Sequence, residues 1–247
     1  MQCKLCFQEK PLTENSHIIP KKFFQKAFIN IPKGFAPENY GDKANRLYSK
    51  ESKSRNQQSG IHVKNILCES CEQKLGVFDN YAQTILLNND KYLKKDDKEK
   101  VWKLQNIDYD YIKLKLFFMS VLWRSQICSD SFFSQVELTS DSEAKLRDMI
   151  INKNPGSENE FSVLLLKYLG EEAESFSVSR GKQLCEVYMF RLGNYTFYIK
   201  VDENSWPDLF QEYMLKPEQD LLIPDGGPYK ETKSYQSDVD NSDKYKA

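Results

Sequence analysis

The feature that most constrains this fold is a pair of Cys-x-x-Cys sequences that lie far apart in the chain. The first contains Cys3 and Cys6 and the second contains Cys68 and Cys71, with 61 residues between them. Each pair can turn two sulfurs toward one metal ion, and two pairs complete the tetrahedron of thiolates that zinc prefers. We therefore predict one zinc ion that joins the start of the chain to the segment around Cys68.

This zinc should have a structural role, because four thiolates leave no coordination position open for water. A redox role for either pair is the alternative, but neither pair lies in a thioredoxin-like strand–helix context. The lone cysteines Cys128 and Cys185 lie in apolar surroundings, which favours small core side chains over nucleophiles.

Length and charge limit the class of protein. A chain of 247 residues can form one large domain or two small ones. The longest apolar run, residues 116–123, is too short to cross a bilayer, and no apolar signal region begins the chain. We therefore expect a cytoplasmic protein without a membrane partner. Residues 1–70 carry 12 Lys+Arg against 6 Asp+Glu, so one basic face could approach phosphates, although a solvated surface explains the same charge.

The first part of the chain alternates short elements with one long loop. We expect a helix over residues 20–29, a polar loop over 32–59 and a strand over 61–67, where apolar and polar residues alternate. Apolar residues at helical spacing predict a helix over 69–87. The charged stretch 94–100 follows, and we place a domain boundary there.

The second part combines helices and strands. Asp108 is a candidate cap for a helix over 109–127, and Ser140 with Glu143 forms a capping box for a helix to residue 152. Residues 161–169 read as a buried strand, and Gly193-Asn194 predicts a hairpin. The fold class is therefore α+β, divided into a zinc module (1–93), an accessory α+β domain (101–224) and a disordered tail (225–247).

Three sequence segments carry a resemblance to a known family. They are Cys-Lys-Leu-Cys at residues 3–6, Ser-His-Ile-Ile-Pro at 16–20 and Leu-Cys-Glu-Ser-Cys-Glu at 67–72. Together they resemble zinc-stapled HNH endonucleases, which have the ββα-metal fold, over roughly residues 1–90. The resemblance implies an N-terminal ββα-metal-like module, magnesium or manganese as a second cofactor, and a setting in bacterial defence or mobile elements.

The resemblance also implies roles for individual residues. His17 matches the position of the general base, and an unperturbed histidine titrates near neutral pH. Glu72 stands where the family has a histidine, and its oxygen can bind a divalent cation. Asn65 would lie on the same strand face as the family's asparagine, one step along. Ser16 departs from the pattern, since the family has Asp or Glu there, and His62 is interpreted as a surface or packing residue.

The leading hypothesis is a metal-dependent endonuclease that hydrolyses DNA phosphodiester bonds with His17, Asn65 and Glu72 in its site. The alternative is a non-catalytic zinc module that binds DNA or a protein partner. RNA cleavage by the same residues stays open. Residues 71–247 carry 23 Lys+Arg against 30 Asp+Glu. This acidic second part would supply homo-oligomerisation, regulation or target choice, or contact with a protein partner.

Overall fold

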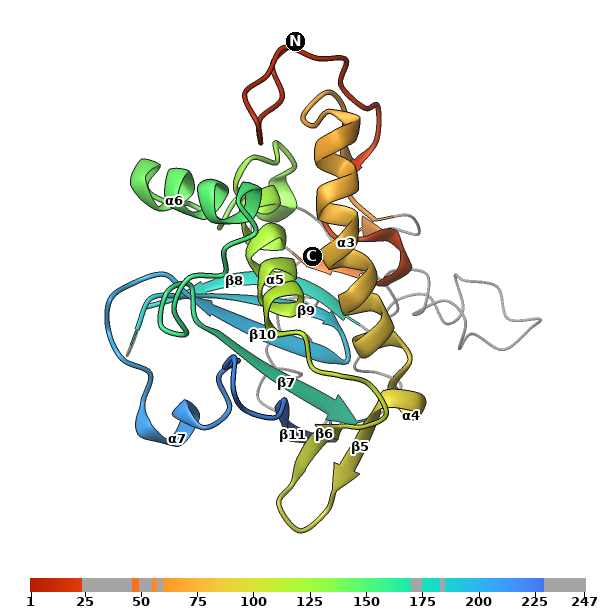
Figure 1. Ribbon diagram of the computed structural model, residues 1–247, viewed down its shortest axis with the longest axis vertical. Coiled ribbons are helices and arrows are strands. Elements are labelled where there is room, and N and C mark those ends of the chain that lie inside the picture. Colours follow the sequence, from red (N-terminus) through yellow and green to blue (C-terminus); the bar gives the residue numbers. More distant parts are fainter. Residues whose placement is uncertain (24–45, 49–54, 57–59, 170–174, 183–184, 229–247) are drawn as a thin grey trace, which may run out of the picture.

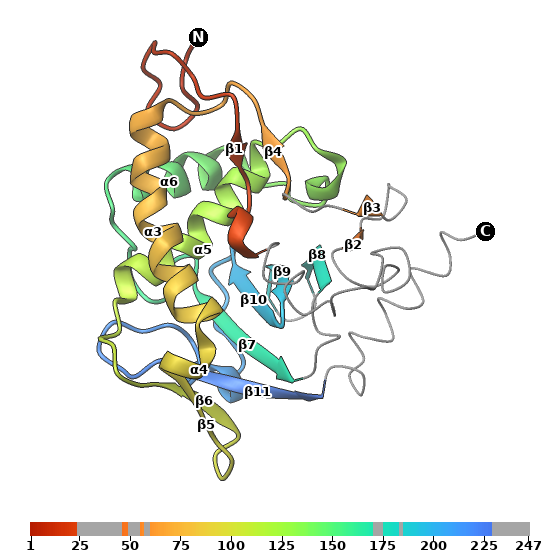
Figure 2. The same ribbon diagram turned by 90° about the vertical axis from the view of Figure 1, so that its right-hand side faces the viewer.

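We analysed a computed structural model, which describes residues 1–23, 46–48, 55–56, 60–169, 175–182 and 185–228. Figures 1 and 2 show a twisted sheet with its long helices stacked on one face and the N-terminal segment beyond those helices. The α+β class expected from the sequence is confirmed. In the described part of the chain, no helix is both long and apolar enough to cross a membrane.

The main sheet joins nine strands in the described residues, in the order β3-β2-β8-β9-β10-β7-β11-β6-β5. Neighbouring strands are antiparallel except for β11 beside β7 and β2 beside β8. The strands are β2 (Arg46–Tyr48), β3 (Arg55–Asn56), β5 (Leu93–Asp96), β6 (Val101–Leu104), β7 (Val163–Leu169), β8 (Ser175–Gly181), β9 (Val187–Gly193), β10 (Tyr195–Lys200) and β11 (Leu222–Pro228). A separate two-stranded ladder pairs β1 (Ser16–His17) with β4 (His62–Val63).

Two long helices form the layer above the sheet. Helix α5 (Tyr111–Gln126) lies on the sheet, where Phe118 meets Phe197 of β10 with ring centroids 4.6 Å apart. Helix α3 (Glu69–Leu87) packs against α5 and buries one apolar side, which its spacing predicts. The remaining helices are α4 (Asn89–Tyr92), α6 (Ser140–Ile151), α7 (Asp208–Gln211) and a 3-10 turn, η1 (Ser131–Phe133).

The caps of α5 and α6 differ by a residue or two from those expected. Asp110, not Asp108, caps α5, because its Oδ1 accepts the Lys113 amide at 2.9 Å. Thr139, the residue before Ser140, caps α6 by accepting the Ser142 amide. Both helices form where the sequence predicts them, and each starts at the side chain that reaches its free amides.

One strand and one hairpin of the sheet agree with the sequence prediction. Strand β7 and the β9–β10 hairpin lie where they are expected, and Gly193 adopts the positive φ of 62° that this turn requires. The charged stretch 94–100 is different, because it forms the β5–β6 hairpin at the end of the sheet. The expected domain boundary falls in this hairpin.

One buried apolar cluster extends across that boundary. It includes Cys3 and Leu75 from the first part of the chain and Phe197 from the sheet. Phe23 stacks on Phe117 of α5 with ring centroids 5.6 Å apart. Residues 1–93, for which a separate module is expected, therefore share a hydrophobic core with the sheet.

Several expected bounds need correction or fall outside the described residues. The strand expected over 61–67 is only two residues long, because Asn65 turns the chain with φ of 58°. Residues 21–23 of the helix expected over 20–29 are helical, and the rest of it lies outside the described residues. Most of the polar loop 32–59 also lies outside them, apart from β2 and β3. Residues 225–228 of the expected tail belong to β11, and residues 229–247 lie outside the description.

Candidate functional site

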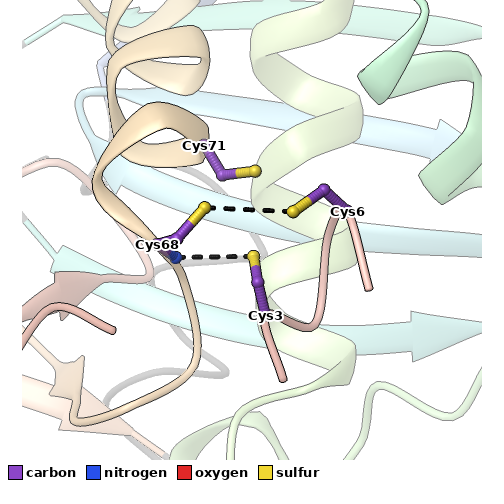
Figure 3. A group of neighbouring side chains, drawn as sticks. All are labelled: Cys3, Cys6, Cys68 and Cys71. Atoms are coloured by element: carbon purple, nitrogen blue, oxygen red, sulfur yellow. Dashed lines mark hydrogen bonds between the residues drawn. The ribbon is translucent and has the colours of Figure 1, made fainter. Parts of the chain in front are cut away.

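The four cysteines of the two pairs converge on one point (Figure 3). Their sulfurs all lie within 4.8 Å of one another, and the Sγ atoms of Cys6 and Cys68 are 3.9 Å apart. A tetrahedral zinc ion with Zn–S bonds of about 2.3 Å needs sulfurs about 3.8 Å apart, whereas a disulfide bond is only about 2.05 Å long. The four thiols are free and can hold a metal ion such as zinc.

The backbone shapes this cluster from two directions. The first pair lies in a tight turn, where the Phe7 amide donates to the Cys3 carbonyl at 2.9 Å and Phe7 has a φ of 56°. The Lys4 amide donates to Ile66, which ties this turn to the chain just before α3. The second pair lies at the start of α3, with Cys68 at the N-cap position. The cysteine cluster thus joins the first turn of the chain to the first turn of a helix.

Three of the four cysteines are buried, and their thiols have perturbed pKa values. Cys3, Cys68 and Cys71 are each at most 2% exposed. Burial raises the pKa of Cys3 and of Cys71 above the ordinary thiol value. Burial also acts on Cys68, but hydrogen bonds, first that of Ser70, outweigh it and lower the pKa of Cys68 to about 6. The Cys68 amide donates to the Cys3 sulfur at 3.4 Å, a contact that suits a metal-bound thiolate.

His17 lies on β1, directly opposite His62 of β4. The two imidazole rings have centroids 5.7 Å apart and are inclined by 44°. His17 is half-buried and His62 is exposed. His62 is therefore the exposed strand residue that the sequence interpretation expects, and the structure adds that it lies beside the predicted base. Pairing the two strands in this register would have predicted the contact between the two histidines, because the register places them directly opposite each other.

Glu72 lies in the first turn of α3 and connects to the residue before His17. The Thr13 hydroxyl lies 3.3 Å from Glu72 Oε1 and 3.0 Å from Ser16 Oγ. Ser16 is fully buried, so its side chain points to the interior while His17 points to the other side of the strand. The Thr13 hydroxyl thus links the carboxylate of Glu72 to the hydroxyl of Ser16 in β1.

Asn65 does not occupy the position expected of it. It lies in a turn with positive φ, is exposed, and its amide donates to the Thr13 carbonyl at 3.0 Å. Because the strand ends at Val63, Asn65 does not share its face, and that prediction was wrong. In the described ranges, the four cysteines are the only group of three or more His, Cys, Asp or Glu side chains close enough to share a metal ion.

Arg124 of α5 is the residue that sequence reasoning missed most completely. Its guanidinium forms a two-point ion pair with Asp79 of α3, with nitrogen–oxygen distances of 2.8 and 3.0 Å. It also donates to the carbonyl of His17 at 3.1 Å and to the carbonyl and hydroxyl of Ser120. All five N–H groups of Arg124 thus have acceptors, and one buried side chain holds α3, α5 and the backbone of β1 together.

The fold and site define an α+β protein with a buried four-cysteine cluster beside a two-histidine rung. Comparisons with protein families, with curated proteins and with solved structures found no match.

Proposed function

We propose that this chain is a metal-dependent endonuclease of the HNH type, which hydrolyses DNA with His17 as general base. The observation that supports this best is the order of β1, β4 and α3 around the cysteine cluster. That order places His17 on the first strand and Glu72 in the first turn of the following helix. Zinc would fix both, because its ligands flank this arrangement in sequence.

His17 would accept the proton of the attacking water, which suits an imidazole on a half-exposed strand. Glu72 offers one carboxylate oxygen in the first turn of α3. Magnesium typically binds one or two carboxylates together with substrate phosphate and water. A magnesium or manganese ion held there would neutralise charge on the scissile phosphate. The exposed side chains of Lys21 and Lys22 follow β1 and would contact neighbouring phosphates.

A binding-only zinc module is the second candidate, and one observation favours it. The family's acidic residue before the base is replaced by Ser16, which is fully buried and bonded to Thr13. Glu72 therefore has no carboxylate neighbour at that position. At the N-terminus of α3, the negative charge of Glu72 would also stabilise the helix through its dipole, without any metal. This candidate predicts tight DNA or protein binding without cleavage.

The test is cleavage of plasmid DNA and of RNA with magnesium or manganese by four proteins. These are the wild type, His17→Ala, Glu72→Gln and a control, Glu69→Gln, which alters the other acidic residue in the first turn of α3. We expect the wild type and the control to cleave DNA, His17→Ala to be inactive, and Glu72→Gln to need more metal. Zinc content and folding should be equal in all four. Binding of DNA by the wild type without cleavage would select the second candidate, and activity of His17→Ala would end the proposed mechanism.

A further inference from the structure

The only two histidines in this chain face each other across one rung of a two-stranded ladder. They are 45 residues apart in sequence, and β1 and β4 bring them together. In an antiparallel ladder, directly opposite side chains point to the same side, so both imidazoles face the same space. A phosphate that reaches His17 therefore also meets His62.

The backbone holds this rung firmly. The Ile18 amide donates to the Ile61 carbonyl at 3.1 Å beside it, and the His17 carbonyl accepts from the buried Arg124. The rings are 5.7 Å apart and inclined by 44°, so they form an open angle rather than a stack. One ring is half-buried and the other is exposed, which leaves access for a ligand from the side of His62.

Hydrolysis of a phosphodiester requires groups that act on both the attacking water and the leaving oxygen. A base removes a proton from the attacking water, and the leaving oxygen needs either a proton or a cation to stabilise its charge. The cation site proposed above has Glu72 as its only carboxylate, and in the described parts of the chain no larger group of ligands lies outside the cysteines. A cation held there by one carboxylate would neutralise charge on the phosphate, and a side chain that donates a proton would stabilise the departing oxygen.

We propose that His62 is the general acid of this site, a role that rests on the proposed nuclease function. Neutral His17 takes a proton from water as the new oxygen–phosphorus bond forms. The opposite phosphorus–oxygen bond breaks, and protonated His62 gives its proton to the departing oxygen, which leaves as a hydroxyl group. The products are a phosphomonoester and an alcohol, and exchange with solvent restores both imidazoles.

The experiment separates a proton donor from a merely structural residue by changing the leaving atom. Wild type, His62→Asn and His17→Ala are compared on an oligonucleotide with its normal bridging oxygen and on one with sulfur at the leaving position. The end groups left by the wild type identify that position as 3′ or 5′. A thiolate leaves without protonation, so a general acid becomes unnecessary on the sulfur substrate.

We expect His62→Asn to be slower than wild type by roughly 10²- to 10⁴-fold on the oxygen substrate. On the sulfur substrate it should match wild type within about threefold, since loss of the acid no longer matters there. His17→Ala should be slow on both substrates. Because the His62 side chain is exposed, His62→Asn should keep the zinc content and unfolding midpoint of the wild type.

Two results would overturn the general acid while leaving the nuclease intact. One is an equal loss on both substrates by His62→Asn. The other is loss of bound manganese in His62→Asn, measured by equilibrium dialysis, which would make the two imidazoles a metal-binding pair. Failure of the wild type to cleave either substrate would overturn the proposed function and this inference together.

Discussion

Replacing Arg124 by alanine would remove a buried side chain that joins α3, α5 and β1. The Arg124 side chain is only 2% exposed and its partner Asp79 is 15% exposed. The substitution would leave a largely buried carboxylate unpaired and take donors away from the carbonyls of His17 and Ser120. It would also delete the aliphatic part of a side chain that lies in the core.

The magnitude follows from this burial. Removing one partner of a buried ion pair typically destabilises a protein by about 3–5 kcal/mol, because the other charge stays buried. The partial exposure of Asp79 lets water reach it, which places the expected loss near the lower end, at about 3 kcal/mol. The control is Lys145→Ala, whose ion pair with Glu160 is 51% exposed on the lysine side and should cost at most about 1 kcal/mol.

The assay is urea unfolding with zinc present, at constant ionic strength, for the wild type, Arg124→Ala and Lys145→Ala. The double variant Arg124→Met with Asp79→Leu should recover part of the loss, because no unpaired charge is left in the core. If the proposed function holds, nuclease activity should fall in Arg124→Ala even at low temperature, since the His17 carbonyl loses its hydrogen-bond donor. A loss below about 1 kcal/mol for Arg124→Ala would refute the view that this ion pair is buried and joins the layers.

Three further predictions concern the metal centre and the buried polar residues. Metal analysis should find one zinc per chain in the wild type and less in Cys68→Ser, whose N-terminal segment should unfold because structural zinc supplies folding free energy. Ser16→Asp should lower the melting temperature in metal-free buffer, because its carboxylate would be buried near Glu72, and manganese should reverse part of that loss. Burial lowers the pKa of Lys115 to about 8, so the folded state binds its proton less tightly than the unfolded state. The contribution of Lys115 to stability should therefore rise between about pH 8 and pH 10.5, and the difference between the urea unfolding free energies of the wild type and Lys115→Met across this range measures it.

Local patterns explain the elements that the sequence predicts well. The bounds of α3 follow from apolar residues at helical spacing, with no competing glycine or proline signal inside beyond Gly76. The β9–β10 hairpin follows from Gly193 and Asn194, and the four metal ligands follow from their spacing. In each case the residues that determine the feature are neighbours in the chain or lie in two short motifs with the spacing of metal ligands.

The missed features depend on contacts between distant residues. Strand β5 has the sequence Leu-Lys-Lys-Asp, which reads as a charged linker and becomes a strand only by pairing with β6 at the end of the sheet. The ion pair between Arg124 and Asp79 joins residues 45 positions apart, and no local pattern relates them. Asn65 reads as part of a strand, but asparagine tolerates positive φ, and here it ends the strand.

The core that runs from the cysteine cluster to the sheet limits how this protein could be divided or recombined. A fragment that ended at residue 93 would take α3 away from α5 and expose Phe23, which stacks on Phe117 in the whole chain. It would also leave Asp79 without its ion-pair partner, Arg124. The pair formed by His17 and His62 therefore depends on the whole fold. A gene fusion or an exon exchange would preserve this pair only if the transferred segment also included the sheet.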